Sequence, residues 1–422
     1  MKRKQWFVLP SDKELTADIA EQYDIEPFLA HLLVSRGITD DMEIEDFCFG
    51  EGMLSDPFEL RDMDKAVSRI NEALEKGEKI AVYGDYDADG VTATALLSLY
   101  FKSLGVSVRT YIPDRNAEGY GLNMKAIKSL CEEGIQLIIT VDNGISAFEE
   151  AEYIKELGME LVITDHHKAT SEIPEAVAVV NPHRLDCPGR YKDFCGVGVA
   201  FKLICALNEG DDEEMLSRFA DIVTVGTIGD VMNLTGENRK IVKAGLELIN
   251  EGNNVGLQAL REVSGMKGKT LSSTSVAFSL VPRINAVGRM SHAVKALELL
   301  LCEDYEDALA LAREIDLSNA SRQEKEREII AEVQKQIEAD PEILNQRLLL
   351  FSGENWHGGV IGIVAARLVG SSPTSCIEEP CRVSTRLFAF FVFNVIINLR
   401  QRQKSSMKGF LVFALLVSCG RI

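Results

Sequence analysis

The chain has 422 residues, enough for two or three domains, and its 46% hydrophobic and 26% charged residues are ordinary for a globular protein. Its net charge of −20 argues against a simple basic surface for nucleic acid, although bound metal ions can reverse the local charge of a carboxylate cluster. Nine scattered cysteines without a CxxC pair, and a basic start without a following apolar run, argue against export and predict a cytoplasmic location.

Residues 1–76 are expected to form a helical lead-in, because residues 64–76 carry apolar side chains at helical spacing. From residue 79, short apolar strands alternate with helices. The expected strands are 79–84, 107–113, 136–141 and 160–164, and the expected helices are 91–105, 124–134 and 147–158. This alternation predicts an α/β fold with parallel strands and right-handed crossovers, as a catalytic domain over residues 77–235.

The next part of the chain is expected to be helical. Residues 236–311 are interpreted as a helical extension, and residues 312–342 as one long, charged helix that connects two domains. A strand at 347–353 and a helix at 359–370 then begin a second α/β domain, over residues 343–370.

Residues 371–422 differ in composition from everything before them. They contain no Asp, but six of the eighteen Phe and three of the nine Cys. Seven Lys or Arg and two Glu give this tail a net charge of +5, which leaves −25 for residues 1–370. Its apolar runs, 387–399 and 410–419, are shorter than the roughly 20 residues of a membrane-spanning helix, so no membrane association is expected. We interpret the tail as atypical, the product of a frame change in the coding sequence and not a native continuation.

Acidic and histidine side chains follow three of the predicted strands. They are Asp85 and Asp87 in GDYDADG, Asp142 in VDNG, and Asp165, His166 and His167 in TDHH. Ligands of an open parallel sheet bind beyond the carboxyl ends of its strands, so these side chains should meet in one crevice. That many carboxylates would repel one another unless cations were bound.

Mixed Asp and His ligands suit Mn²⁺ or Mg²⁺, and the absence of Cys from these motifs argues against structural zinc. Two ions about 4 Å apart would suit an in-line displacement at phosphorus. Each motif alone has a plainer explanation. The DxDxDG pattern resembles a calcium loop, but Leu96 stands where an EF-hand needs Glu. An isolated Asp at a strand end is often a helix cap. The coincidence at successive strand ends favours the metal site.

Six segments resemble motifs of the DHH phosphoesterase family and its RecJ-like branch. They are YGDYDADG (83–90), VDNG (141–144), TDHH (164–167), TIGDVMNL (227–234), PRINAVGRM (282–290) and HGGVIGIVAARL (357–368). The resemblance covers about residues 45–370. It implies a parallel-sheet DHH domain joined by a long helix to a partial DHHA1-type α/β domain. It also implies removal of nucleotides from the 5′ end of single-stranded DNA in repair and recombination, with two Mn²⁺ or Mg²⁺ ions. The implied protein partners are a helicase or a single-strand-binding protein.

The resemblance also implies roles for individual residues. The implied metal ligands are Asp85, Asp87, Asp142, His166 and Asp230, with Asp142 bridging both ions and His167 near the phosphate. Asp89 is expected to hold the loop before Gly90, and Asp165 to orient an imidazole. Candidates for phosphate contacts are Arg283 and Arg289, for which salt bridges are the alternative, and His357, at an expected helix start.

The sequence departs from the family after residue 370. Neither a Gly-rich GxGRS-type segment nor an oligonucleotide-binding barrel follows. Three alternatives therefore stay open: a family member that cleaves short oligonucleotides or cyclic dinucleotides, a scaffold without activity, and an inactive truncated nuclease.

Overall fold

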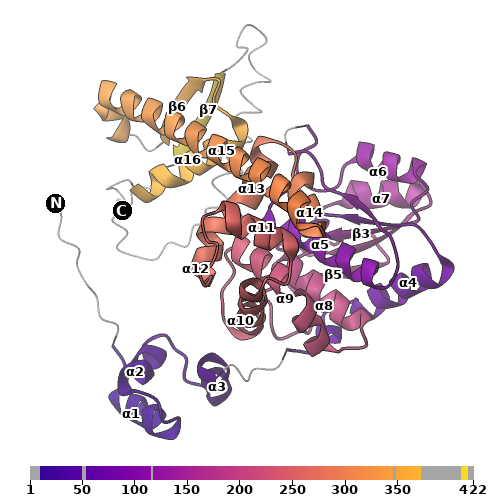
Figure 1. Ribbon diagram of the computed structural model, residues 1–422, viewed down its shortest axis with the longest axis horizontal. Coiled ribbons are helices and arrows are strands. Elements are labelled where there is room, and N and C mark those ends of the chain that lie inside the picture. Colours follow the sequence, from indigo (N-terminus) through magenta and orange to yellow (C-terminus); the bar gives the residue numbers. More distant parts are fainter. Residues whose placement is uncertain (1–9, 50–53, 116, 346–347, 372–409, 417–422) are drawn as a thin grey trace.

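A five-stranded parallel sheet lies at the centre of the protein. The computed structural model describes residues 10–49, 54–115, 117–345, 348–371 and 410–416 (Figure 1). The strands are β1 (Ile80–Tyr83), β2 (Arg109–Tyr111), β3 (Leu137–Val141), β4 (Glu160–Thr164) and β5 (Ala178–Val180), in the spatial order β2-β1-β3-β4-β5. All four neighbouring pairs are parallel, which confirms the predicted α/β fold class. The short β5 was not predicted.

The two faces of the sheet bury alternate side chains of each strand. Ile80 and Val82 join one core with helices α4 (Met63–Lys76), α5 (Ala88–Ser103) and α8 (Gly196–Leu207). Ala81 and Tyr83 join a second core with α6 (Met124–Glu132) and α7 (Phe148–Glu156). Because both faces are covered, the central strands β1 and β3 are buried along their whole length, as expected of a parallel sheet, whereas the edge strand β2 is partly exposed.

The sheet has a topological switch point between β1 and β3. The chain passes from β1 to β2 on one side and then returns to β3 on the other side of β1. At such a point the loops after the two strands diverge and leave a crevice beyond their carboxyl ends. Asp85 follows β1 and Asp142 follows β3, so the crevice and the predicted acidic site coincide.

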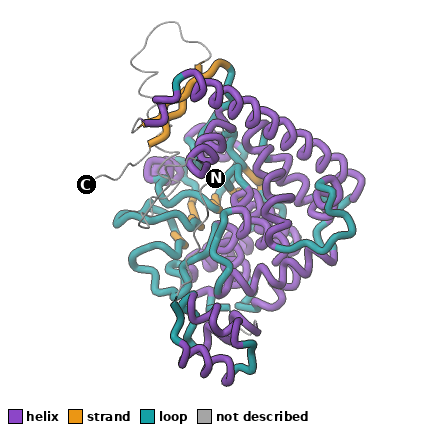
Figure 2. The backbone as a smooth tube through the Cα atoms, turned by 90° about the vertical axis from the view of Figure 1, so that its left-hand side faces the viewer, coloured by secondary structure: helices purple, strands orange, loops and turns teal. Residues whose placement is uncertain are grey.

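A layer of helices follows the sheet, and helices predominate in the backbone trace (Figure 2). They are α9 (Asp212–Gly229), α10 (Gly236–Glu251), α11 (Val255–Val263), α12 (Ser273–Ser275), the π-helix η2 (Val276–Leu280), α13 (Val281–Met290) and α14 (Val294–Leu301). The long connecting helix α15 (Tyr305–Ala339) begins earlier than the expected residue 312. It begins there because the Asp304 carboxylate accepts hydrogen bonds from the N–H groups of Glu306 and Asp307, at 2.9 and 3.0 Å.

Beyond α15, a small second layer contains η3 (Pro341–Asn345), β6 (Leu348–Glu354) and α16 (Gly358–Ser371). Its core joins Ile329 and Val333 of α15 to Phe351 and Val360. The strand β7 (Phe410–Leu416) pairs antiparallel with β6, a strand that was not expected in the tail. The rest of the tail, residues 372–409 and 417–422, lies outside the described residues. The interpretation of the tail as atypical, like the other domain bounds, stays a prediction.

The N-terminal helices form a separate small unit. Helices α1 (Lys13–Gln22), α2 (Pro27–Ser35) and α3 (Asp41–Phe49) share a core of Ile19, Ala30, Leu33 and Ile44. Arg239 of α10 lies over the Phe47 ring, 4.2 Å from its centroid, and so joins this unit to the main body. A 3₁₀ turn, η1 (Pro57–Glu59), leads into α4. Within the described part of the chain, no helix is both long and apolar enough to cross a membrane.

A buried ion pair fixes the segment before η1 to the main body. The side chain of Lys202 is fully buried, and its Nζ donates to the carbonyl oxygen of Ser55 and to Glu237 Oε2, the latter at 3.1 Å. Lys202→Ala should lower the free energy of unfolding by about 3–5 kcal/mol, because Glu237 would keep a buried charge without its cation. Urea unfolding followed by circular dichroism measures this loss. Lys240→Ala, which breaks the exposed pair with Glu213, is the control and should cost about 1 kcal/mol or less. Equal losses would contradict the assignment.

Candidate metal centre

Three neighbouring strands deliver acidic and imidazole side chains to the crevice. Asp85, Asp142 and His166 follow β1, β3 and β4 and are 2%, 2% and 5% exposed. Asp142 has a left-handed backbone, with φ of 61°, which turns the chain sharply at the end of β3. The strand pattern therefore brings together the residues that the sequence predicted.

The cluster is compact. His166 Nε2 lies 3.1 Å from Asp142 Oδ1 and 3.7 Å from Asp230 Oδ2. Three overlapping groups have ligand atoms within 4.8 Å of one another: Asp85 with Asp87 and Asp142, Asp142 with His166 and His167, and Asp89 with His166 and Asp230. Asp142 belongs to two of these groups, which is the geometry that a bridging ligand needs. Asp230 arrives from the end of α9, so no strand pattern could have located it.

One of the aspartates also begins a helix. Asp87 Oδ1 accepts hydrogen bonds from the N–H groups of Asp89 and Gly90, at 3.0 and 3.1 Å, and so caps α5. A Cβ at position 90 would lie 2.5 Å from the Asp85 nitrogen, so only glycine permits this turn.

The sequence led us to expect that Asp89 holds the loop before Gly90. Its side chain instead binds another helix. Its carboxylate accepts hydrogen bonds from Gly196 N at 2.6 Å and Val197 N at 2.8 Å, at the start of α8. Asp89 thus fixes α8 against the cluster, where the Gly196 backbone packs on the Asp142 side chain.

Asp165 orients the histidine pair. Its Oδ1 accepts hydrogen bonds from the backbone N–H groups of His166 and His167 and lies 2.7 Å from His167 Nδ1. Its Oδ2 accepts a hydrogen bond from Ile145 N at 2.9 Å. Although burial opposes the charged form, the bonds from His167 and Ile145 hold the pKa of Asp165 below its ordinary value. Asp165 therefore stays ionised and fixes the His167 ring.

At the other buried carboxylates hydrogen bonds do not outweigh the effect of burial, even at Asp89, which accepts two from α8. Burial, followed by the charges of neighbouring aspartates, raises the pKa of Asp85, Asp89 and Asp142 well above the ordinary value. Within the described residues, no hydrogen bond reaches the buried Asp85 Oδ1. Buried carboxylate oxygens and one imidazole, with no thiolate among them, are the donors that Mn²⁺ and Mg²⁺ take in proteins. The donor set therefore fits divalent cations.

The three residues predicted to contact phosphate have different partners in the structure. Arg283 is engaged elsewhere, because its Nε and Nη2 lie 2.9 and 2.8 Å from Asp316 Oδ1, so the salt-bridge alternative holds. Arg289 lies between the metal cluster and α16, with Nη1 donating to the Gly359 carbonyl at 3.2 Å. His357 Nδ1 accepts a hydrogen bond from Gly359 N at 3.1 Å, which places the proton of the neutral ring on Nε2.

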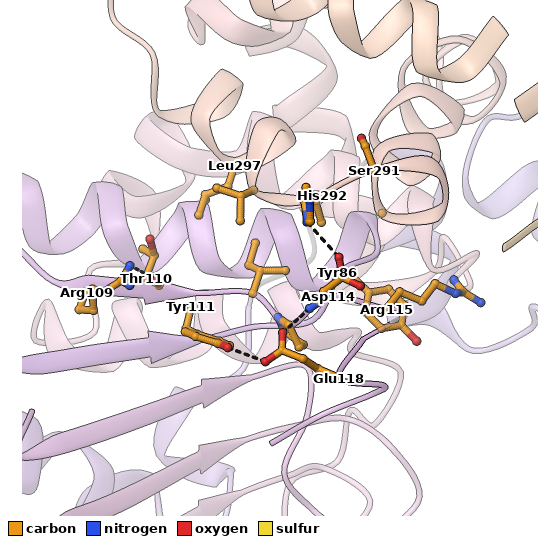
Figure 3. A pocket seen from close by; sticks show the side chains of 15 residues that line it. Tyr86, Arg109, Thr110, Tyr111, Asp114, Arg115, Glu118, Ser291, His292 and Leu297 are labelled. Atoms are coloured by element: carbon orange, nitrogen blue, oxygen red, sulfur yellow. Dashed lines mark hydrogen bonds and ion pairs between the residues drawn. The ribbon is translucent and has the colours of Figure 1, made fainter. Parts of the chain in front are cut away.

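Sequence reasoning missed the loop after β2. Tyr120 donates from its hydroxyl to the Asp142 carbonyl at 3.1 Å, and the same hydroxyl lies 3.3 Å from His167 Nδ1. Arg115 stands over the Tyr86 ring, 4.9 Å from its centroid, beside a cavity of about 360 Å³ (Figure 3). The signal that could have identified this loop was its position after β2, a strand that neighbours β1.

Comparison with known proteins gives consistent matches. Residues 79–227 match the DHH family, N-terminal domain. The single-stranded-DNA-specific exonuclease RecJ of Bacillus subtilis is 40% identical over 87% of this chain and 46% of its own length. The Escherichia coli enzyme of the same name is 36% identical over 84% of this chain and 63% of its own length. The chain thus spans about half to two thirds of these relatives.

Solved structures agree with these matches. RecJ of Thermus thermophilus in complex with Mn²⁺ has a TM-score of 0.73 and 33% identity over 87% of this chain and 52% of its own. A second structure, exonuclease RecJ bound to manganese, has a TM-score of 0.65 and 39% identity over 74% of this chain and 77% of its own.

The close packing of α8 on Asp142 yields a prediction. In Gly196→Ala the new Cβ would overlap the Asp142 side chain and displace it, so Mn²⁺ binding should weaken by about 10–100-fold. Isothermal titration calorimetry with Mn²⁺ measures the change. The control is Gly198→Ala in the same helix, where the nearest atom is Phe194 Cδ1 at 3.2 Å and can shift. Unchanged Mn²⁺ affinity in folded Gly196→Ala protein would show that the α8 contact does not position Asp142.

Proposed function

This chain belongs to the RecJ family of DHH phosphoesterases, and we propose that it hydrolyses single-stranded DNA from the 5′ end with two divalent cations. The observation that carries the proposal is the set of three overlapping ligand groups, two of which share Asp142 and two His166. A scaffold would have no need to bury so many carboxylates in one crevice. The proposed role is in DNA repair and recombination, and the proposed partners, beyond the DNA, are a helicase or a single-strand-binding protein.

The proposed ligands divide into two sets. Asp85 and Asp87 would hold one ion, His166 and Asp230 the other, and Asp142 would contact both. Asp89 is assigned a positioning role, because both of its oxygens already accept hydrogen bonds from α8. The ions, when bound, supply Lewis-acid activation of water and of the phosphate.

His167 is proposed to act on the substrate phosphate. Its ring is fixed by Asp165 through Nδ1 and is about one third exposed, at the open side of the cluster. Because Asp165 Oδ1 accepts from the Nδ1–H, a neutral ring would leave Nε2 without a proton, and only a protonated ring has a second N–H. A protonated His167 can therefore donate a hydrogen bond from Nε2 to a phosphate oxygen.

A cationic wall opposite the cluster favours a polyanionic substrate. We place Arg115, Arg289 and Arg322 in this wall, from the β2–α6 loop, α13 and α15. Burial and the charges of Arg115 and Arg322 lower the pKa of Arg289 to about 10, so the guanidinium groups repel one another. Arg322 donates from its terminal nitrogens to Glu326 and Asn319, at 2.8 and 2.9 Å, and within the described residues its buried Nε has no hydrogen-bond partner. Substrate phosphates would relieve this repulsion, since guanidinium groups bind phosphate in a bidentate manner. His357, two residues before Gly359, is a further proposed hydrogen-bond donor to the substrate phosphates at this wall, through the proton on its Nε2.

The function is tested by substrate choice. With Mn²⁺, the chain should hydrolyse 5′-labelled single-stranded DNA faster than blunt duplex, a dinucleotide or a cyclic dinucleotide, and excess chelator should abolish the reaction. Gel electrophoresis and chromatography of the products measure the four rates. Faster turnover of the cyclic dinucleotide would favour the oligonucleotide or cyclic-dinucleotide alternative. Absence of hydrolysis on all four substrates would favour an inactive truncated nuclease.

The bridging assignment is tested at Asp142. Asp142→Asn keeps the shape of the side chain, and Asn tolerates the left-handed backbone, but the bridging charge is lost. Activity should fall below detection with unchanged circular dichroism. The matched variant Asp165→Asn disturbs the hydrogen bonds that orient the histidine pair and should cost roughly 10–100-fold. Equal activities of the two variants would refute a special role for Asp142.

A further inference from the structure

Helix α9 ends in a turn that most other helices of the chain build with glycine. The Val231 N–H donates to Ile228 O and the Met232 N–H to Thr227 O, both at 3.2 Å. This pair of bonds defines the Schellman motif, in which the residue after the cap has positive φ. Val231 occupies that position, with φ of 59°.

The same bond pattern ends seven other helices. Six of them, α2, α4, α5, α6, α7 and α11, have glycine where α9 has valine, and α1 has Asp24. The glycines are Gly37, Gly77, Gly105, Gly134, Gly158 and Gly265. Among the described non-glycine residues with positive φ, Val231 is the sole β-branched one; the others are Asp, Asn or Glu. Left-handed backbone is least favourable for β-branched side chains, so Val231 is strained.

Packing does not explain why a valine stands there. Val231 is 87% exposed in the described structure, so its side chain gains almost nothing from the core. Its position does offer an explanation, because it directly follows Asp230, whose Oδ2 lies 3.7 Å from His166 Nε2. Strain that a fold retains beside a reactive site is commonly part of how the site works.

We infer that Val231 is a substrate contact, an apolar surface on which the nucleobase next to the scissile phosphate packs. The inference rests on the proposed function and deepens it. Bound cations and arginines would hold the phosphates of a single strand. Its unstacked bases still expose apolar faces, and these need an apolar surface on which to pack. A duplex already stacks its bases, and such a contact therefore favours single strands.

The test compares two variants at this position with a matched control. Val231→Gly and Val231→Asn both tolerate the left-handed backbone and remove the apolar branch. Glu209→Gly is the control, because Glu209 is exposed and has φ of 58° just beyond the end of α8. Helix α8 has 12 residues, so that end lies roughly 18 Å from the cluster at its start. Both glycine variants should unfold at temperatures no lower than that of the wild type, and all three should keep Mn²⁺ affinity.

The decisive measurement is binding by fluorescence anisotropy. The probes are a 3′-labelled ten-nucleotide strand with phosphorothioate linkages at its 5′ end, and the same strand with abasic sites at its first two nucleotides. Wild-type chain and Glu209→Gly should prefer the strand with bases. In both Val231 variants that preference should fall by roughly 3–10-fold, with little change for the abasic strand.

Each other outcome is decisive. A base preference that is unchanged in both Val231 variants overturns the inference, as does a wild-type chain that binds neither strand. Binding without hydrolysis of an ordinary phosphodiester strand overturns the proposed function alone. A loss of affinity that is equal for both strands would show that the variants damage the site in general, and it also overturns the base contact.

Discussion

Repulsion between buried carboxylates is the constraint on which the rest of this structure depends. Asp85, Asp89 and Asp142 are buried at the switch point of the sheet, where burial and mutual charge raise the pKa of each. The fold offsets part of this cost with backbone amides, since Asp87 caps α5 and Asp89 binds the first amides of α8. Backbone amides do not offset the cost of burying Asp85, because within the described residues no hydrogen bond reaches its Oδ1. Divalent cations complete the compensation, which makes the charge repulsion itself the source of metal affinity.

The same constraint organises the opposite side of the crevice. In a chain of net charge −20, guanidinium groups from a loop, α13 and α15 are brought close enough for Arg115 and Arg322 to lower the pKa of Arg289. Metal ions on one side and arginines on the other would present positive charge to a strand from two directions. An acidic protein can thus bind a polyanion, because binding depends on the local field and not on the sum of charges.

Two of the six described non-glycine residues with positive φ lie at the same place. Asp142 and Val231 both have left-handed φ. His166 approaches the carboxylate of Asp142 and that of Asp230, the residue before Val231. Most other helix ends of this kind use glycine, at Gly105 or Gly158 for example. The apolar cores above and below the sheet stabilise the surrounding elements enough to hold these two residues in unfavourable conformations.

The sequence by itself determined the α/β class, four strands of the parallel sheet and the cluster of Asp85, Asp142 and His166, because these follow from local patterns. Buried parallel strands are continuous apolar runs, and residues after them must reach one edge. It missed the three-residue β5, whose run is too short to show a period, and it located Asp230 by resemblance only. Only the tertiary structure decided which charged groups meet. Asp89 binds α8, 107 positions along the chain, Arg283 binds Asp316, and Tyr120 reaches the Asp142 carbonyl. Hydrophobic periodicity sets where an element forms, whereas a single polar contact depends on how elements pack, and that information is not local.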